Sequence, residues 1–200
     1  MKDSILALQS ARIGFAVTGS FCTFERAFEQ MGALSAAGAE VFPILSENAY
    51  QTDTRFYTAA LVREIVTAKC GRPIWHTLGE VEPIGPKKLL DLLIIAPCTG
   101  NTLGKLAGGI IDTPPVMAAK SQLRNGRPVL LAIATNDGLA LAAKNIGMLM
   151  TMRNVYFVPY GQDDPQRKPY SLVAHMDALP EAAGEAIQGR QIQPILRVYE

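Results

Sequence analysis

The alternation of short apolar runs with amphipathic segments constrains the fold of this chain more than any other feature. Apolar runs typical of strands occur at 12–18, 40–45, 89–96, 128–134 and 155–159. Helical spacing occurs between and after them, at 25–37, 54–69, 103–109, 138–150 and 171–186. This order is typical of a parallel sheet covered by helices on both faces. We therefore predict an α/β fold, a single three-layer Rossmann-like domain with a parallel sheet flanked by helices.

The chain has the length of one domain, and no linker or internal repeat divides it. Its 200 residues are predicted to form a single domain over 1–200. Within it, the polar, irregular stretch that begins at Gly161 is predicted to start a C-terminal lid or partner-contact segment with a tail helix, 161–200. We expect this segment to face either a ligand or a second protein.

Charge and cysteine content exclude several classes of protein. With a net charge of +1 and no basic run, the chain lacks a nucleic-acid signature. Only 18% of its residues are charged, below the usual value of about 25%, which favours surface buried between the protomers of a homo-oligomer. Three cysteines without a CxxC pair indicate neither a disulfide framework nor a zinc site. Because neither a membrane span nor a signal peptide is expected, we predict a cytoplasmic protein.

A turn of small polar residues follows the most apolar predicted strand. LLIIA at 92–96 leads into PCTGNT at 97–102, and a helix of small residues begins at Leu103. In open α/β sheets, ligands bind where strands lead into helices, and the free amides of a helix N-terminus favour an anion. Hydroxyl and amide side chains there suit a phosphate, a carboxylate or the polar edge of a heterocycle. The turn therefore predicts a small-molecule site.

A second polar turn, Thr18-Gly19-Ser20, follows the first predicted strand. Its glycine permits close approach to the backbone and its hydroxyls can donate, as in a phosphate cradle. Gly14 and Gly19 have the glycine spacing of a Walker A motif, but Ser20 replaces the lysine, and the dinucleotide fingerprint GxGxxG is absent. A P-loop NTPase and a self-contained NAD site are therefore disfavoured. A plain helix cap by Ser20 or Thr23 remains the alternative to a phosphate site.

Together the two turns resemble the flavoprotein family that contains the homo-oligomeric flavin-containing cysteine decarboxylases. This family also includes phosphopantothenoylcysteine decarboxylase, the lantibiotic decarboxylases and the prenyl-FMN synthases. Its hallmark is a Pro-x-Ser-Ala-Asn-Thr turn followed by Lys, Gly and Asp at the spacing of Lys105, Gly108 and Asp112. The match covers most of 12–160. It implies a flavodoxin-like form of the three-layer fold, FMN as the cofactor and trimer-based homo-oligomers.

A more specific resemblance is to the B subunits of the dipicolinate synthases. Three stretches carry it, EPIGPKKLLDLLIIAPCTGNT (82–102), ATNDGLALAAKNIG (134–147) and NVYFVPYGQDDPQRKPYSLVAHM (154–176). It implies the NADP-linked oxidation of dihydrodipicolinate to dipicolinate, pyridine-2,6-dicarboxylate, during sporulation. Because this chain has no dinucleotide fingerprint, the separate A subunit of the dipicolinate synthase would supply the NADP site. The alternatives are an FMN-dependent decarboxylase or flavin prenyltransferase, and a non-catalytic scaffold.

The resemblance also implies roles for individual residues. Asn101 matches the position whose amide meets a substrate carboxyl in the decarboxylases, and Asn136 matches the asparagine of the family's substrate clamp. We predict both as catalytic residues. The first turn and Ser46 match positions that hold the flavin phosphate, and the second turn matches one that lies against the isoalloxazine ring and the substrate. The predicted cofactor-binding residues are Thr18, Gly19, Ser20, Ser46, Pro97, Thr99 and Thr102.

Three departures from the family pattern bear on the reaction. The catalytic histidine of the decarboxylases is missing around 82–85, Thr99-Gly100 replaces Ser-Ala, and Thr135 replaces the clamp methionine. These changes disfavour cysteine decarboxylation. Removing a hydride and a proton from a dihydropyridine needs orientation more than a strong nucleophile, because aromatisation supplies the driving force.

The remaining histidines and cysteines are predicted to be structural. We interpret His76 as a partly buried packing residue, and His175 as a surface or subunit-contact residue on the last helix. Cys98 is expected to be a small neutral residue beneath a ligand, and Cys22 a packed thiol. None of the four is predicted to be a nucleophile or a base.

Overall fold

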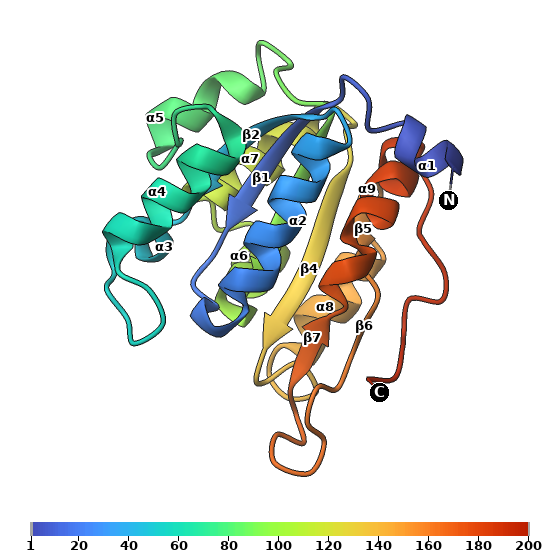
Figure 1. The fold of residues 1–200 in the computed structure, drawn as a ribbon. Helices are drawn as coiled ribbons and strands as arrows, with labels where there is room; N and C mark the ends of the chain where they lie inside the picture. Colours follow the sequence, from blue (N-terminus) through green and yellow to red (C-terminus); the bar gives the residue numbers. More distant parts are fainter. Residues whose placement is uncertain (1, 200) are drawn as a thin grey trace.

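The protein is a three-layer sandwich of helices around one twisted sheet (Figure 1). The computed structural model describes residues 2–199, so residues 1 and 200 of the predicted single domain lie outside the described residues. No helix among residues 2–199 is both long and apolar enough to cross a membrane.

The sheet is mostly parallel, which confirms the predicted fold class. Its parallel strands run in the order β2-β1-β3-β4, and β5 also pairs with β4. Every residue of β3 is buried. A strand covered on both faces must be apolar at nearly every position, and this is why the apolar runs predicted these strands correctly. Their bounds are β1 Arg12–Val17, β2 Glu40–Leu45, β3 Leu92–Cys98, β4 Val129–Thr135 and β5 Val155–Phe157.

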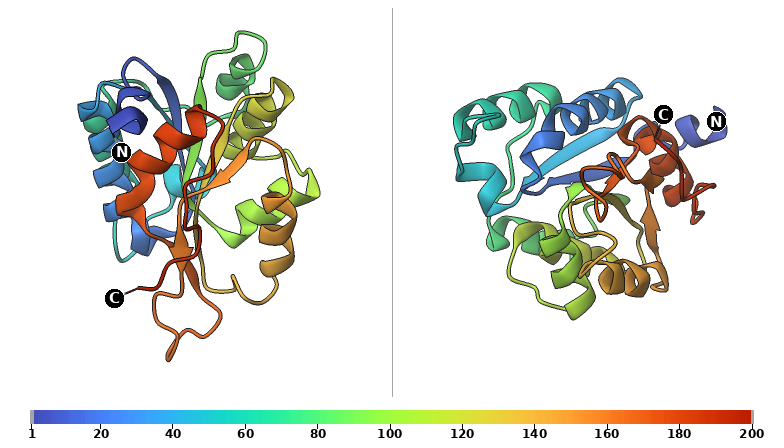
Figure 2. Two further views of the ribbon diagram at one scale, coloured as in Figure 1. Left: turned by 90° about the vertical axis from the view of Figure 1, so that its right-hand side faces the viewer. Right: turned by 90° about the horizontal axis from the view of Figure 1, so that it is seen from below.

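Helices cover both faces of the sheet (Figure 2). One face carries α2 (Phe24–Ala36), α4 (Ala59–Cys70) and α9 (Leu179–Ile187), and the other carries α6 (Gly100–Gly108), α7 (Pro114–Arg124) and α8 (Ala143–Met150). The short helices are α1 (Lys2–Leu6), α3 (Glu47–Gln51) and α5 (Leu78–Val81), with 3-10 turns η1 (Phe21–Thr23), η2 (Glu82–Ile84) and η3 (Met176–Ala178).

The predicted helix over 171–186 is wrong in its first half. Residues Leu172–Ala174 form strand β7, which pairs antiparallel with the end of β4 and with β6, Tyr160–Gly161. Helix α9 begins only at Leu179, with a proline in its first turn, where the missing N–H costs nothing. The sheet therefore has an antiparallel edge that the sequence patterns did not predict.

Two further helices begin later than predicted, and α7 was not predicted, nor were the short helices α1, α3 and α5. Residue Thr58 caps α4 by accepting the N–H of Leu61, so the expected helix at 54–69 lacks its first turn. Before α8, the carbonyl of Asp137 accepts two turn hydrogen bonds, which delays the helix expected at 138–150. Helix α7 begins with Pro114-Pro115, and these prolines suit the first positions of a helix.

An ion-pair cluster closes the amino ends of the central strands. Asp91 accepts hydrogen bonds from Arg12 Nη2 at 2.7 Å and from Arg12 Nε at 3.0 Å. Arg127 Nη1 donates to the same carboxylate at 3.0 Å. The hydrogen bond from Arg12 holds the pKa of Asp91 below its usual value, against the opposing effect of burial. The cluster joins the starts of β1, β3 and β4 at the end of the sheet opposite the polar turns.

The C-terminal residues return along the antiparallel edge. The N–H of Arg197 donates to the carbonyl of Tyr160 at 3.0 Å, and the hydroxyl of Tyr199 donates to the carbonyl of Ala174 at 2.8 Å. A Cβ on Gly161 would lie 2.0 Å from the carbonyl oxygen of Arg197, so only glycine permits this approach. The role of 161–200 as a lid or partner-contact segment stays a prediction.

Candidate functional site

A hollow of about 450 Å³ lies at the carboxyl ends of β1, β2 and β3. Parallel strands end at the same edge of a sheet, so the loops after these strands meet there. Six of the nine predicted site residues line the hollow, together with four others. The predicted six are Thr18, Gly19, Ser46, Thr99, Asn101 and Thr102, and the others are Glu47, Asn48, Lys105 and Thr113. The structure therefore brings both polar turns into one site.

Thr18 joins the ends of β1 and β3. This residue is only 2% exposed, and its hydroxyl donates to the carbonyl of Pro97 at 2.7 Å. The same hydroxyl accepts the N–H of Thr99 at 3.1 Å. These bonds use its only proton and one of its two lone pairs. The geometry therefore makes Thr18 a positioning residue for the second turn.

Helix α6 begins at the hollow and presents unpaired amides there. Thr99 caps the helix, because its hydroxyl accepts the N–H of Thr102 at 3.3 Å. The N–H groups of Gly100 and Asn101, the first two of the helix, have no partner within residues 2–199. Unpaired amides and the helix dipole favour an anion. The exposed side chain of Asn101 adds an amide donor to this end of the hollow.

The start of helix α3 also lines the hollow. Ser46 caps it by accepting the N–H of Ala49 at 3.3 Å, which leaves the hydroxyl proton free for a ligand. Asn48 also lines the hollow, and sequence reasoning missed it. A Cβ on Gly19 would lie 3.6 Å from the Cβ of Asn48, an ordinary contact. The packing of the protein itself therefore does not require a glycine at 19.

Gly100 allows the loop after β4 to approach α6. A Cβ on Gly100 would lie 2.6 Å from the hydroxyl oxygen of Thr135 and 2.8 Å from a carboxylate oxygen of Asp137. The Thr135 hydroxyl also donates to Asp137. The replacement of the family alanine by glycine is thus explained by the protein's own side chains, which occupy the space of the missing methyl group.

Lys105 and Asp112 form an ion pair at the rim of the hollow. Lys105 Nζ donates to the two Asp112 carboxylate oxygens at 2.7 and 2.8 Å. Their side chains are 22% and 54% exposed, respectively. Lys105 lines the hollow, whereas Asp112 does not. Lys105 is therefore held by a carboxylate that lies outside the lining of the hollow.

Three predicted site residues do not line the hollow. Pro97 is buried at the end of β3, where its carbonyl accepts the bond from Thr18. The carbonyl of Ser20 accepts the hydroxyl of Thr23 at 2.7 Å, which turns the chain into α2. Asn136 is exposed in the loop after β4. It lies between Thr135 and Asp137, the two residues that a Cβ at position 100 would meet. Of the three, only Asn136 has a side chain exposed beside the site.

The histidines and cysteines lie away from the lining of the hollow. His76 stacks on Tyr50, with ring centroids 3.7 Å apart, as expected of a packing residue. Cys98 is fully buried, and burial raises the pKa of its thiol, so it is not a nucleophile. Cys22 is exposed in η1, so the expectation of a packed thiol was wrong. A single-turn 3-10 helix leaves its side chain outside the core.

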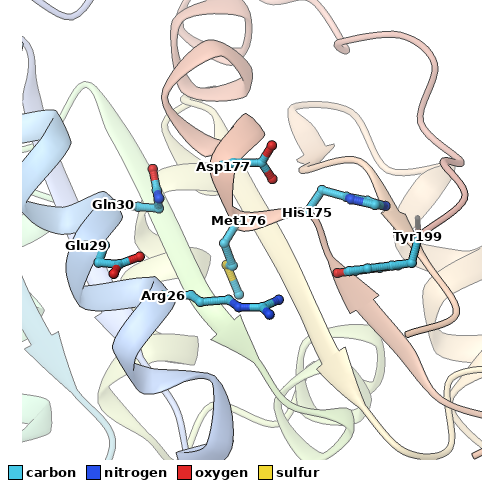
Figure 3. Close-up of a pocket in the computed structure, with 7 residues that line it drawn as sticks. All are labelled: Arg26, Glu29, Gln30, His175, Met176, Asp177 and Tyr199. Carbon is cyan, nitrogen blue, oxygen red and sulfur yellow. The ribbon is translucent and has the colours of Figure 1, made fainter. Parts of the chain in front are cut away.

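A second, smaller hollow of about 250 Å³ lies between α2, η3 and the C-terminal residues (Figure 3). His175 stacks on Tyr199 there, with centroids 4.0 Å apart, and Arg26 lies across from this pair. The placement of His175 on the last helix was wrong, because this residue precedes η3. None of the nine predicted site residues lines this hollow.

The donors around the first hollow fit an anionic group. Ser46, Asn48, Asn101 and the free amides of α6 can all donate hydrogen bonds, and Lys105 adds a positive charge. These groups suit the phosphate of FMN or the carboxylates of a small acid. Within residues 2–199, no group of three or more His, Cys, Asp or Glu residues is placed to hold a metal ion.

Comparison with known proteins gives a consistent set of relatives. The Flavoprotein family model matches residues 3–179. The dipicolinate synthase B subunit of Bacillus subtilis (strain 168) is 45% identical over 190 residues, which cover 95% of each chain. The crystal structure of the dipicolinate synthase B subunit from Bacillus halodurans C matches with a TM-score of 0.88 and 43% identity, over 96% of this chain and 98% of that chain. The FMN-dependent cysteine decarboxylase SpaF shares the fold, with a TM-score of 0.68 and 18% identity over 91% and 98% of the two chains.

Proposed function

This chain belongs to the Flavoprotein family, and we propose that it is the flavoprotein-like B subunit of a dipicolinate synthase. The proposed reaction oxidises dihydrodipicolinate to dipicolinate, with NADP⁺ taking the hydride and the solvent taking the proton. The NADP is held by a separate A subunit, and the complex acts in the cytoplasm during sporulation. The observation that carries the proposal is the 45% identity, over 95% of the chain, to the B subunit of a dipicolinate synthase.

In this proposal the chain binds and orients the dicarboxylate. Asn101 and the free N–H groups at the start of α6 receive one carboxylate, because both are donors at the same end of the hollow. Asn136 approaches the substrate from the loop after β4. Holding the ring in one orientation towards the NADP of the A subunit supplies most of the catalysis, since a positioned reactant needs little further activation.

Flavin binding is part of the proposal. Ser46 and Asn48 would hold the phosphate of FMN, with Thr99 and Thr102 beside the ring. FMN, when bound, supplies hydride or electron transfer. The low charged fraction, 18%, supports a homo-oligomer, which we propose to be trimer-based.

The lining of the hollow favours oxidation over the alternative of cysteine decarboxylation. No histidine is among the lining residues within 2–199, and His76 stacks on Tyr50 instead. A decarboxylase that relies on a histidine base lacks that group here.

Reconstitution from purified components tests the proposal. The A subunit with NADP⁺ should convert dihydrodipicolinate to dipicolinate rapidly only when this chain is added. Conversion at the same rate without this chain would show that the chain has no catalytic role. Carbon dioxide release from a cysteine-containing peptide would favour the decarboxylase instead.

A further inference from the structure

Lys105 is the one cationic side chain that lines the hollow within residues 2–199. The binding of one carboxylate by residues 97–102 explains neither the position of Lys105 in the lining nor its ion pair with Asp112. A dicarboxylate brings two negative charges into the site, and the exposed Glu47 in the lining adds a third. Neutral donors alone compensate such charge poorly. A cation in the lining would therefore serve to bind the dicarboxylate.

The ion pair with Asp112 leaves the ammonium group with a free donor. An ammonium group has three N–H donors, and the two oxygens of Asp112 take two of them at 2.7 and 2.8 Å. One donor remains for a ligand. Because Asp112 does not line the hollow, it fixes the lysine from outside without occupying the ligand's space.

Lys105 also lies on the same face of α6 as Asn101. The two residues are one helical turn apart, and side chains at this spacing are neighbours on a helix surface. One wall of the hollow thus presents an amide and free N–H groups at the helix start, and a fixed cation one turn further along. This spacing suits a ligand with two separate anionic groups.

We propose that Lys105, positioned by Asp112, binds the second carboxylate of the dicarboxylate and so selects dicarboxylates over monocarboxylates. Asn101 and the α6 amides bind the first carboxylate. This inference rests on the proposed function and adds to it the residue that sets substrate specificity.

The test compares two ligands on three proteins, the unmodified chain, Lys105→Gln and a control variant, by isothermal titration calorimetry. The ligands are pyridine-2,6-dicarboxylate and pyridine-2-carboxylate, which differ by one carboxylate. Lys105→Gln should weaken binding of the dicarboxylate about 10- to 100-fold, the usual effect of losing a hydrogen bond to a charged group. Binding of the monocarboxylate should change less than about 2-fold, because its one carboxylate stays at the helix start. Lys120→Gln, on the exposed surface of α7, is the matched control and should bind both ligands as the unmodified chain does.

The variant should fold, because Asp112 is 54% exposed and remains solvated without its partner. Equal weakening of both ligands, or no weakening of either, would overturn the inference. Inorganic phosphate and FMN are titrated in parallel: a loss confined to these two ligands would assign the ammonium to a phosphate and would also overturn it.

Failure of the proposed function gives a different result. If the complex of the unmodified chain with the A subunit neither binds the dicarboxylate nor forms it from dihydrodipicolinate, the function is wrong and this inference falls with it. If that complex is active and Lys105→Gln discriminates between the two ligands as strongly as the unmodified chain does, only the inference is wrong.

Discussion

The replacement Thr18→Val tests whether one buried hydroxyl holds the two polar turns together. Valine has the shape of threonine, so the change removes hydrogen bonds without opening a cavity. The bonds lost are the one to the Pro97 carbonyl, at 2.7 Å, and the one from the Thr99 N–H, at 3.1 Å. Each contributes about 1 kcal/mol net, and an unpaired buried carbonyl costs about 1–3 kcal/mol. We therefore expect Thr18→Val to lower the free energy of unfolding by about 2–4 kcal/mol.

Urea unfolding followed by circular dichroism measures this change. Thr151→Val is the matched control, because the Thr151 hydroxyl also donates to a backbone carbonyl but is exposed. It should change the free energy of unfolding by less than about 0.5 kcal/mol. Thr18→Ser keeps the hydroxyl and should cost only about 1 kcal/mol for the lost methyl group.

The stability and ligand binding of Thr18→Val show whether its hydroxyl holds the turns. If Thr18→Val is as stable as the unmodified protein, or more stable than Thr18→Ser, the hydroxyl does not hold the turns. The same variant should weaken ligand binding in the hollow, since Thr99 caps the helix that presents the free amides. Unchanged binding would show that the α6 N-terminus keeps its place without Thr18.

Three further predictions concern the packing and charge of the fold. Gly100→Ala should lower the free energy of unfolding by about 1–3 kcal/mol and move the loop after β4, because the new Cβ would lie 2.6 Å from Thr135 Oγ1. Unshifted NMR signals of this loop would contradict this prediction. Asp91→Asn should destabilise the protein at neutral pH by an amount that shrinks as the pH falls. The pKa of Asp91 is held down by Arg12 in the folded state, so its stabilisation is present above the usual value of about 4 and is lost as the pH falls through the folded pKa. Urea titrations at several pH values would refute this if the difference stayed constant. Gly184→Ala should release α1 from α9, because the new Cβ would lie 2.0 Å from a backbone carbonyl oxygen in α1. Hydrogen exchange of the amides in α1 should then accelerate. Unchanged protection of these amides would contradict the prediction.

Sequence patterns predicted the centre of this fold well and its edge poorly. The buried strands are apolar throughout, so Leu92–Cys98 is recognisable without any knowledge of its neighbours. Strand Leu172–Ala174 has only three residues and exists because the end of β4 is available for antiparallel pairing. Three residues are too few to show the hydrophobic period that separates a strand from a helix. The composition of 171–186 therefore fitted a helix as well as it fitted a strand.

The location of the hollow was predictable, whereas the hydrogen bonds among the residues around it were not. Polar turns after parallel strands indicated the hollow, and the structure brings Ser46, Thr99 and Asn101 to it. The internal bonds of Thr18 depend on the distance between two loops that are far apart in sequence. The place of Lys105 in the lining likewise depends on how the loop that carries Asp112 folds back onto α6.

A crystal structure of this chain in complex with the A subunit, grown with dipicolinate, would show directly where the dicarboxylate binds. We expect the ligand in the hollow at the ends of β1, β2 and β3, with one carboxylate at Asn101 and the N-terminus of α6 and the other at Lys105. A ligand bound wholly within the A subunit, or in the hollow lined by Arg26 and Tyr199, would contradict it.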